Sequence, residues 1–278
     1  VMRIAGDTTG SVHCILEALR RQSDCRTNGP VTGLPLVRRI LTEAPSRRFE
    51  AQFLVAFPAP APFDCRIDAD ALGDGLADQG LVLFERDSES ATVDEFPEVL
   101  GDVTAWNKLF SWSFWQQYKF RFPEGVAYED MALMASAYLA AGQFDLISAR
   151  SYFWRVRAEG QSLSQRKTEL KSLKDRLHAI TLIDRYVRAA VAKGLIQPEV
   201  HTAYLRHMIA LDFELFAPEL DRADEEFFAT YKASANQLLS EATGEDWAAS
   251  SGKFRRVVWA AMHGSREQTL KVLGEAKA

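Results

Sequence analysis

Apolar side chains recur at helical spacing from residue 168 to the end of the chain, and this pattern constrains the fold more than any other feature. Its clearest stretch places six branched apolar residues on one face: Leu170, Leu173, Leu177, Ile180, Ile183 and Val187. Residues three and four apart share a face of an α-helix, so this stretch predicts a long helix that is buried on one side. Similar spacing over 204–215, 227–239 and 254–261 predicts further helices. The sequence therefore predicts a C-terminal helical region over residues 168–278.

The N-terminal part has a different pattern, in which short apolar runs are separated by Gly and Pro. "AQFLVAF", residues 51–57, predicts a buried strand that "PAPAP" ends, because proline has no backbone N–H to donate. "LVLFE", residues 81–85, predicts a second buried strand, followed by a polar loop over 86–95. Helical patterns over 12–21 and 34–42 precede the first of these strands. Alternating helices and strands predict an α/β layer with a largely parallel sheet.

Aromatic residues dominate the segment that follows residue 100, and a short apolar helix is expected after them. In "WNKLFSWSFWQQYKFRFPEGVAYEDMALM", residues 106–134, eight aromatic residues come before a Gly turn and two adjacent carboxylates, Glu129 and Asp130. A short helix is expected at 113–118, and the apolar spacing predicts a second helix from Glu129 until Gly142. "FDLIS" and "SYFWRVR" then predict strands.

Composition and charge limit the class of protein. The 278 residues are 47% hydrophobic and 26% charged, with a formal net charge of −5, which is typical of a folded protein and disfavours a nucleic-acid-binding surface spread over the whole chain. No run approaches the roughly 18 apolar residues of a membrane span, and the first residues lack the pattern of a secretory signal. We therefore expect a cytoplasmic protein, free or at the inner face of the membrane. The three cysteines have no CxxC spacing, which disfavours a disulfide framework and a zinc knuckle.

The residues alone leave two interpretations of Glu129 and Asp130 open. Acids at the start of a helix stabilise it by about 0.3 to 1 kcal/mol each, because they complement the helix dipole. A carboxylate at a helix end that faces a cleft is also suited to accept a proton from an attacking hydroxyl group. The pattern favours stabilisation of the helix over a catalytic role. Both can hold at once, with one acid of the pair in each role.

Cations gather in two stretches. Lys108 follows Trp106 and Asn107, which fits either a core Trp with solvated neighbours or a lysine that receives a phosphate. Residues 155–167, "RVRAEGQSLSQRK", surround Gly160 with cations and hydroxyl groups, which suits either an exposed loop or an anion pocket. The candidate anion-binding side chains there are Arg155, Arg157, Ser162, Ser164 and Arg166.

Several common catalytic motifs are absent from the sequence. It contains no GxxxxGK[ST], GxGxxG, HExxH or GxSxG, so nucleotide triphosphatases, dinucleotide oxidoreductases, zinc proteases and serine hydrolases have no motif support. Asp68 and Asp70, in "DAD", are either ligands for a divalent cation or part of a solvated acidic surface.

Taken together, the motifs after residue 100 resemble the second half of family 2 glycosyltransferases. The resemblance rests on "TAWNKLF", "SFW", "FRFPEGVAYEDMAL", "YFWRVRAEGQSLSQRK" and "LKDRLHAI". It is dense from about Val99 to Val187 and continues more loosely through the helical tail. The chain is similar in particular to the teichoic-acid and capsule type, which is often fused to CDP-glycerol glycerophosphotransferases.

The resemblance implies an α/β, GT-A-like (Rossmann-like) fold with a mixed sheet and a C-terminal helical extension. The implied domain spans 1–167, with a shortened nucleotide-binding half at 1–98 and an acceptor half at 99–167, before the helical region 168–278. The implied reaction transfers a sugar, with inversion, from a nucleotide-sugar to a hydroxyl acceptor such as a cell-wall or capsule glycan. Asp130 would be the base of that transfer, beside Glu129.

The family neutralises the leaving diphosphate with Mn²⁺ or Mg²⁺ held by a DxD motif, and with nearby cations, here Lys108 and the arginines of 155–167. This chain departs from that pattern in its first half. "TNGPVTG", residues 27–33, keeps only the glycines of the family's "DDGSTDG", and "PAPAP" follows the strand where the DxD acids belong. A different alignment makes Asp68 and Asp70 the metal motif. If the DxD acids are lost, two alternatives to metal-dependent transfer follow. One is metal-independent transfer, and the other is an inactive pseudo-glycosyltransferase that acts as a binding or scaffold module.

Overall fold

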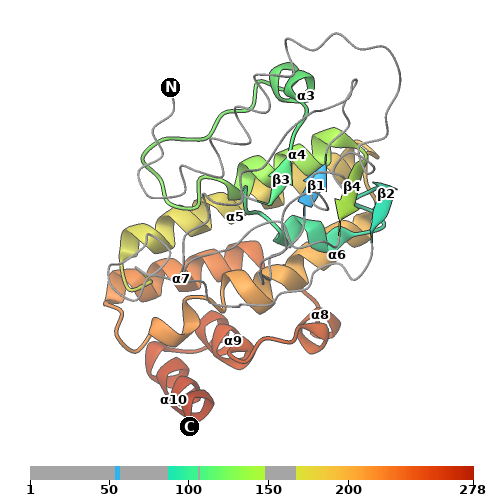
Figure 1. Cartoon of the computed structure of the whole chain (residues 1–278). Coiled ribbons are helices and arrows are strands. Elements are labelled where there is room, and N and C mark those ends of the chain that lie inside the picture. Colours follow the sequence, from blue (N-terminus) through green and yellow to red (C-terminus); the bar gives the residue numbers. More distant parts are fainter. Residues whose placement is uncertain (1–53, 57–86, 106, 148–166) are drawn as a thin grey trace, which may run out of the picture. The chain divides into compact units, whose positions relative to one another are not determined.

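The computed structural model describes residues 54–56, 87–105, 107–147 and 167–278, and they form a mixed α/β structure that is mostly helical (Figure 1). These residues belong to two compact units that alternate along the chain. The first unit contains 54–56, 87–95, 104–105, 107–121 and 140–147. The second unit contains 96–103, 122–139 and 167–278. The division predicted at residue 167 stays a prediction.

The first unit contains a four-stranded sheet in the order β2-β4-β1-β3. Its strands are β1 (Leu54–Ala56), β2 (Ser88–Ala91), β3 (Lys108–Leu109) and β4 (Phe144–Ile147). β1 runs parallel to β3, whereas β4 runs antiparallel to both β1 and β2. The prediction of a largely parallel sheet is therefore wrong for the described strands. An apolar run indicates that a strand is buried but carries no information on the direction in which the chain enters it.

Strand β2 lies within the segment that the sequence predicts as a polar loop. "SESA" has none of the β-branched or aromatic residues that favour strands, so its extended form depends on pairing with β4. The backbone N–H of Ser90 donates to Asp145 on β4 at 3.0 Å, and Ser90 itself has a φ of 54° where the pairing is irregular. Ala91 is buried. Tertiary pairing overrides local preference here.

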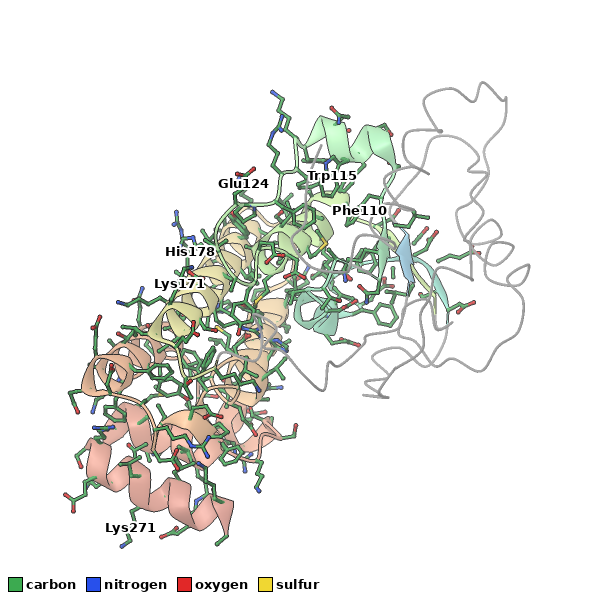
Figure 2. All side chains as sticks on the ribbon, turned by 60° about the vertical axis from the view of Figure 1, so that its left-hand side comes forward. Phe110, Trp115, Glu124, Lys171, His178 and Lys271 are labelled. Carbon is green, nitrogen blue, oxygen red and sulfur yellow. The ribbon has the colours of Figure 1, made fainter. Side chains whose placement is uncertain are left out.

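An aromatic cluster surrounds helix α3 (Trp112–Gln117), which confirms the short helix predicted at 113–118. The Ser111 hydroxyl begins this helix by accepting the N–H of Phe114 at 3.2 Å. Trp115 packs edge-on against Phe110 and Phe120, with ring centroids 5.2 and 5.4 Å apart. Figure 2 labels Trp115 on this helix and Phe110 just before it in the chain. Five of the aromatic residues that precede the acid pair therefore pack on one another: Phe110, Phe114, Trp115, Tyr118 and Phe120.

Helix α4 (Met131–Ala141) confirms the apolar helix predicted after the acid pair. Met134, Ala135 and Tyr138 are fully buried, and the hydroxyl group of Tyr138 donates to Asp102 at 3.4 Å. Gly142 follows the helix with a φ of +68°, a conformation that glycine adopts without steric cost.

The second unit is built from helices, as the apolar spacing predicts. Besides most of α4, they are the 3₁₀ turn η3 (Pro97–Gly101), α5 (Leu170–Ala192), α6 (Pro198–His207), the π-helical turn η5 (Met208–Asp212), the 3₁₀ turn η6 (Ala217–Glu219), α7 (Glu225–Leu238), α8 (Gly244–Ala249), α9 (Arg255–His263) and α10 (Arg266–Lys277). α5 packs on α6 and α7, α7 on α9, and α9 on α10 (Figure 1). Five of the six stripe residues of α5 are buried and Leu170 is half-buried.

Polar caps fix where the later helices begin. Thr243 and Asp246 form a reciprocal capping box at the start of α8, and Ser265 and Gln268 form another at the start of α10. Asp224 caps α7 by accepting the N–H of Phe227 at 2.8 Å. No helix among the residues that the structure describes combines the length and apolar character needed to cross a bilayer.

Candidate functional site

Glu129 and Asp130 lie directly before the first residue of α4, and both side chains are half-buried. The backbone carbonyl of Asp130 accepts the N–H of Met134 at 2.8 Å, so Asp130 occupies the residue that begins the helix. The partial positive charge at a helix N-terminus stabilises a carboxylate in its ionised form. The structure therefore presents an acid at the end of a helix, as both interpretations of the pair require.

Tyr128, which precedes the acid pair, adopts a left-handed backbone conformation with a φ of 61°. A bulky residue in this region carries a steric cost and persists where surrounding contacts fix it. The carbonyl group of Tyr128 accepts the N–H of Met131 at 3.3 Å, which closes a turn over the two acids. The backbone conformation of Tyr128 thus sets the direction in which the side chains of Glu129 and Asp130 point.

Helix α5 holds the backbone of this loop through one carboxylate. Asp175 accepts the backbone N–H of Ala127 at 2.9 Å and the ammonium group of Lys171 at 2.6 Å. Lys171 also donates to the carbonyl of Gly125 at 3.3 Å. Figure 2 shows Lys171 on α5. The side chain of Asp175 is only 14% exposed, so these hydrogen bonds are partly shielded from water.

The same face of α5 holds the Tyr128 side chain. The guanidinium of Arg176 lies over the Tyr128 ring, 4.9 Å from its centroid, and the Tyr128 hydroxyl group lies 3.4 Å from that of Ser172. Arg176 in turn forms a buried ion pair with Asp212 of the π-helical turn, in which Nε donates to Oδ1 at 2.9 Å. The second carboxylate oxygen of Asp212 is buried and has no hydrogen-bond partner. Sequence reasoning missed this cluster because Arg176 and Asp212 lie far apart in the chain.

His207 lies beside this pair, with Nε2 3.7 Å from Asp212. Burial lowers the pKa of His207, and Arg176 lowers it further, although the carboxylate of Asp212 opposes both effects. Tyr204 stacks on the imidazole ring with centroids 6.1 Å apart. The cluster therefore favours a neutral histidine next to a buried ion pair.

Lys108 belongs to the first unit, and its side chain is fully buried. The ammonium group donates to the carbonyl of Thr104 at 2.6 Å and to Asn107 Oδ1 at 2.8 Å. Asn107 is also buried, so the interpretation that both side chains are solvated is wrong. The lysine faces protein oxygens in this structure, and contact with a phosphate requires those contacts to rearrange.

The other predicted site residues lie outside the described part of the chain. They are Trp106, Arg155, Arg157, Ser162, Ser164, Arg166, Asp68 and Asp70. Among the residues that the structure does describe, no group of three or more His, Cys, Asp or Glu side chains is arranged to hold a metal ion. The described donors therefore do not fit Mn²⁺ or Mg²⁺, and the metal stays a prediction.

A hollow of about 390 Å³ lies among α8, α9 and α10. Its lining includes Trp247, Arg255, Arg256, Trp259 and Val272. Arg255 donates to the carbonyl groups at the end of α8, and Trp259 is 47% exposed. Of the predicted site residues that the structure describes, Lys108, Glu129 and Asp130 do not line this hollow.

The chain matches no protein-family model, no curated protein and no solved structure.

Proposed function

We propose that this protein is a GT-A-like glycosyltransferase that transfers a sugar from a nucleotide-sugar donor to a hydroxyl acceptor with inversion, using Asp130 as its base. The observation that carries the proposal is the position of Asp130, a half-buried carboxylate at the N-terminus of α4 on a loop fixed to α5. A base must combine a fixed direction with access to its substrate. The sequence resemblance supplies the reaction class, and the mixed strand directions beside β1 are compatible with it.

In the proposed reaction, the carboxylate of Asp130 accepts the proton of the acceptor hydroxyl group as the oxygen attacks the anomeric carbon. The bond from that carbon to the diphosphate breaks at the same time, and the nucleoside diphosphate leaves with the electron pair. Cations that neutralise the leaving group would lower the barrier. Arg155, Arg157 and Arg166 are the candidates for this role, with Ser162 and Ser164 as hydrogen-bond donors.

A divalent cation would supply the same charge neutralisation in the family that the chain resembles. Asp68 and Asp70 are the residues that would hold it. No step of the proposed reaction depends on that metal.

An inactive pseudo-glycosyltransferase is the second candidate, and the burial of Lys108 favours it. A lysine whose ammonium group already contacts Thr104 and Asn107 is not presented to a donor phosphate. The replacement of the family's acids by "PAPAP" points in the same direction. In this case the chain would keep the acceptor half as a binding or scaffold module.

Titration with nucleoside diphosphates, with and without Mn²⁺, separates the two candidates. An active donor site should bind at least one of them with micromolar to millimolar affinity, on the order of −8 to −4 kcal/mol. Release of nucleoside diphosphate from a panel of nucleotide-sugars, with glycan and polyol acceptors, then measures transfer. A wild-type chain that binds no nucleotide and releases none would leave only the scaffold function.

Asp130→Asn should lower the transfer rate by about a hundredfold or more, because the amide cannot accept the proton. The affinity for the nucleoside diphosphate should stay within about twofold, since the base acts on the acceptor. Glu129→Gln is the matched control, with the same chemical change one residue earlier. Equal losses in the two variants, or loss of nucleotide binding in Asp130→Asn, would contradict the assignment of the base.

A further inference from the structure

We infer that Asp175 and the buried pair of Arg176 and Asp212 are positioning residues for Asp130, an inference that rests on the proposed function. They are not expected to touch substrate. They act on the loop of residues 125–128, which is followed directly by the acid pair. This loop and its partners on α5 all belong to the second unit.

The loop needs stabilising contacts from other elements because its own backbone conformation is unfavourable. Tyr128 has a φ of 61°, outside the regions that bulky residues prefer. Such backbone geometry persists when surrounding contacts determine it, and it is common at functional sites. Without those contacts Tyr128 would return to a negative φ, and the side chains of Glu129 and Asp130 would point in another direction.

Asp175 supplies the hold on the backbone. Its Oδ2 atom accepts both the Ala127 N–H and the Lys171 ammonium group, at 2.9 and 2.6 Å. A charged acceptor strengthens a hydrogen bond to a backbone N–H. Lys171 extends the hold by donating to the carbonyl of Gly125. Asp175 and its partner Lys171 therefore tie two points of the loop to a single turn of α5.

Arg176 and Asp212 supply the hold on the side chain. Arg176 lies over the Tyr128 ring, and its guanidinium is fixed in turn by two donations to Asp212 Oδ1. The side chains of Arg176 and Asp212 are 10% and 1% exposed. A cation held in this way fixes the position of the ring and thereby opposes a change in the φ of Tyr128. Asp212 belongs to the π-helical turn, a type of irregularity that recurs at functional sites.

Hydrogen exchange in the wild type, Asp175→Ala and Asp175→Asn tests the hold directly. Alanine removes both contacts of Asp175, whereas asparagine keeps an oxygen that can accept the Ala127 N–H. We expect Asp175→Ala to speed exchange in peptides covering 125–131 by about tenfold or more, with little change in α6 and α7. Asp175→Asn should stay closer to the wild type. Unchanged exchange of the loop in Asp175→Ala would overturn the inference.

Kinetics distinguish a positioning role from a merely structural one. In the transfer assay, Asp175→Ala should lower kcat by about tenfold or more at an unchanged KM for the donor, and Asp175→Asn should recover most of the rate. Tyr128→Gly, which removes the ring and the steric constraint together, should give the same loss if Asp175→Ala fails to fold. A released loop with an unchanged kcat would overturn the inference while leaving the proposed function intact.

A wild-type chain that transfers no sugar would overturn both the proposed function and the claim that these residues position Asp130 for catalysis. The exchange measurement would still show whether Asp175 fixes the loop. The two failures are therefore distinguishable.

Discussion

At the scale of single residues, the second unit contains a second buried carboxylate that joins separate helices. Asp184 on α5 accepts hydrogen bonds from His201 of α6 at 2.9 Å and from Arg188 at 2.7 Å. Burial alone would raise the pKa of Asp184, but these two hydrogen bonds together hold its pKa below the usual value. Arg188 also reaches the exposed Glu241 at 2.9 Å. The same arginine thus has one buried and one exposed partner.

Asp184→Ala should lower the free energy of unfolding by about 2 to 4 kcal/mol, because it leaves His201 and Arg188 without their buried acceptor. Glu241→Gln removes the exposed partner of the same arginine and should cost about 1 kcal/mol or less. Urea unfolding of both variants checks the difference. Similar losses in the two variants would mean that burial of Asp184 contributes little.

The sequence predicted the position of some residues and not the environment of others. It placed Asp130 at the start of a helix because apolar spacing begins just after it, and the structure confirms that position. It did not predict that Lys108 and Asn107 are buried. Polarity suggests solvent exposure, whereas Lys108 lies on a paired strand and its ammonium group donates to Thr104 and Asn107. Contacts such as Arg176 with Asp212 depend on helix packing, which local spacing does not encode.

At the scale of elements, the turn η3 packs against α6 with little space between them. A Cβ atom at Gly101 would lie 2.5 Å from Cε1 and 2.7 Å from Nδ1 of His207. Gly274 in α10 is the opposite case, because a Cβ there would meet no atom within 4 Å. Only the first of these glycines is required by packing.

Gly101→Ala should therefore destabilise the protein by about 1 to 3 kcal/mol, because the added methyl group forces the imidazole of His207 to move. Gly274→Ala should instead stabilise it by about 0.5 to 1 kcal/mol, since alanine favours a helix and limits the unfolded chain. Thermal unfolding of the pair measures both signs. A stabilising Gly101→Ala would show that η3 is not held against His207.

Elements with strong periodicity were predictable, and elements created by tertiary contacts were not. The stripe of α5 and the glycine after α4 gave correct helices. The sequence predicted continuous helical structure over 204–215, whereas α6 ends at His207 and a π-helical turn follows. Asp212, which that turn buries against Arg176, has no signature in the local pattern. Strand β2 was missed for the same reason, since its pairing with β4 is non-local.

At the scale of the whole molecule, the half-buried His207 links stability to pH. The pKa of His207 is lowered in the folded state, so the unfolded chain binds a proton more readily. Below the unfolded pKa of about 6.5, protonation therefore favours the unfolded state, and stability falls as the pH decreases towards the folded pKa. Above about pH 7 this group contributes no pH dependence.

The free energy of unfolding should accordingly be lower at about pH 5.5 than at about pH 7.5, and His207→Gln should reduce that difference by up to about 1.4 kcal/mol per pH unit. The exposed His178 on α5 provides the control (Figure 2). His178→Gln should leave the pH dependence close to that of the wild type. Identical pH profiles for the His207 variant and the wild type would contradict the link.

The alternation of the two units along the chain has a consequence for synthesis. Residues 96–103 and 122–139 belong to the same unit as the helices from α5 onward, yet the ribosome makes them first. Until those helices emerge, apolar side chains such as Val99, Met134 and Tyr138 lack much of the unit to which they belong. The nascent chain is therefore most exposed to premature association in the interval before residues 170–278 leave the exit tunnel.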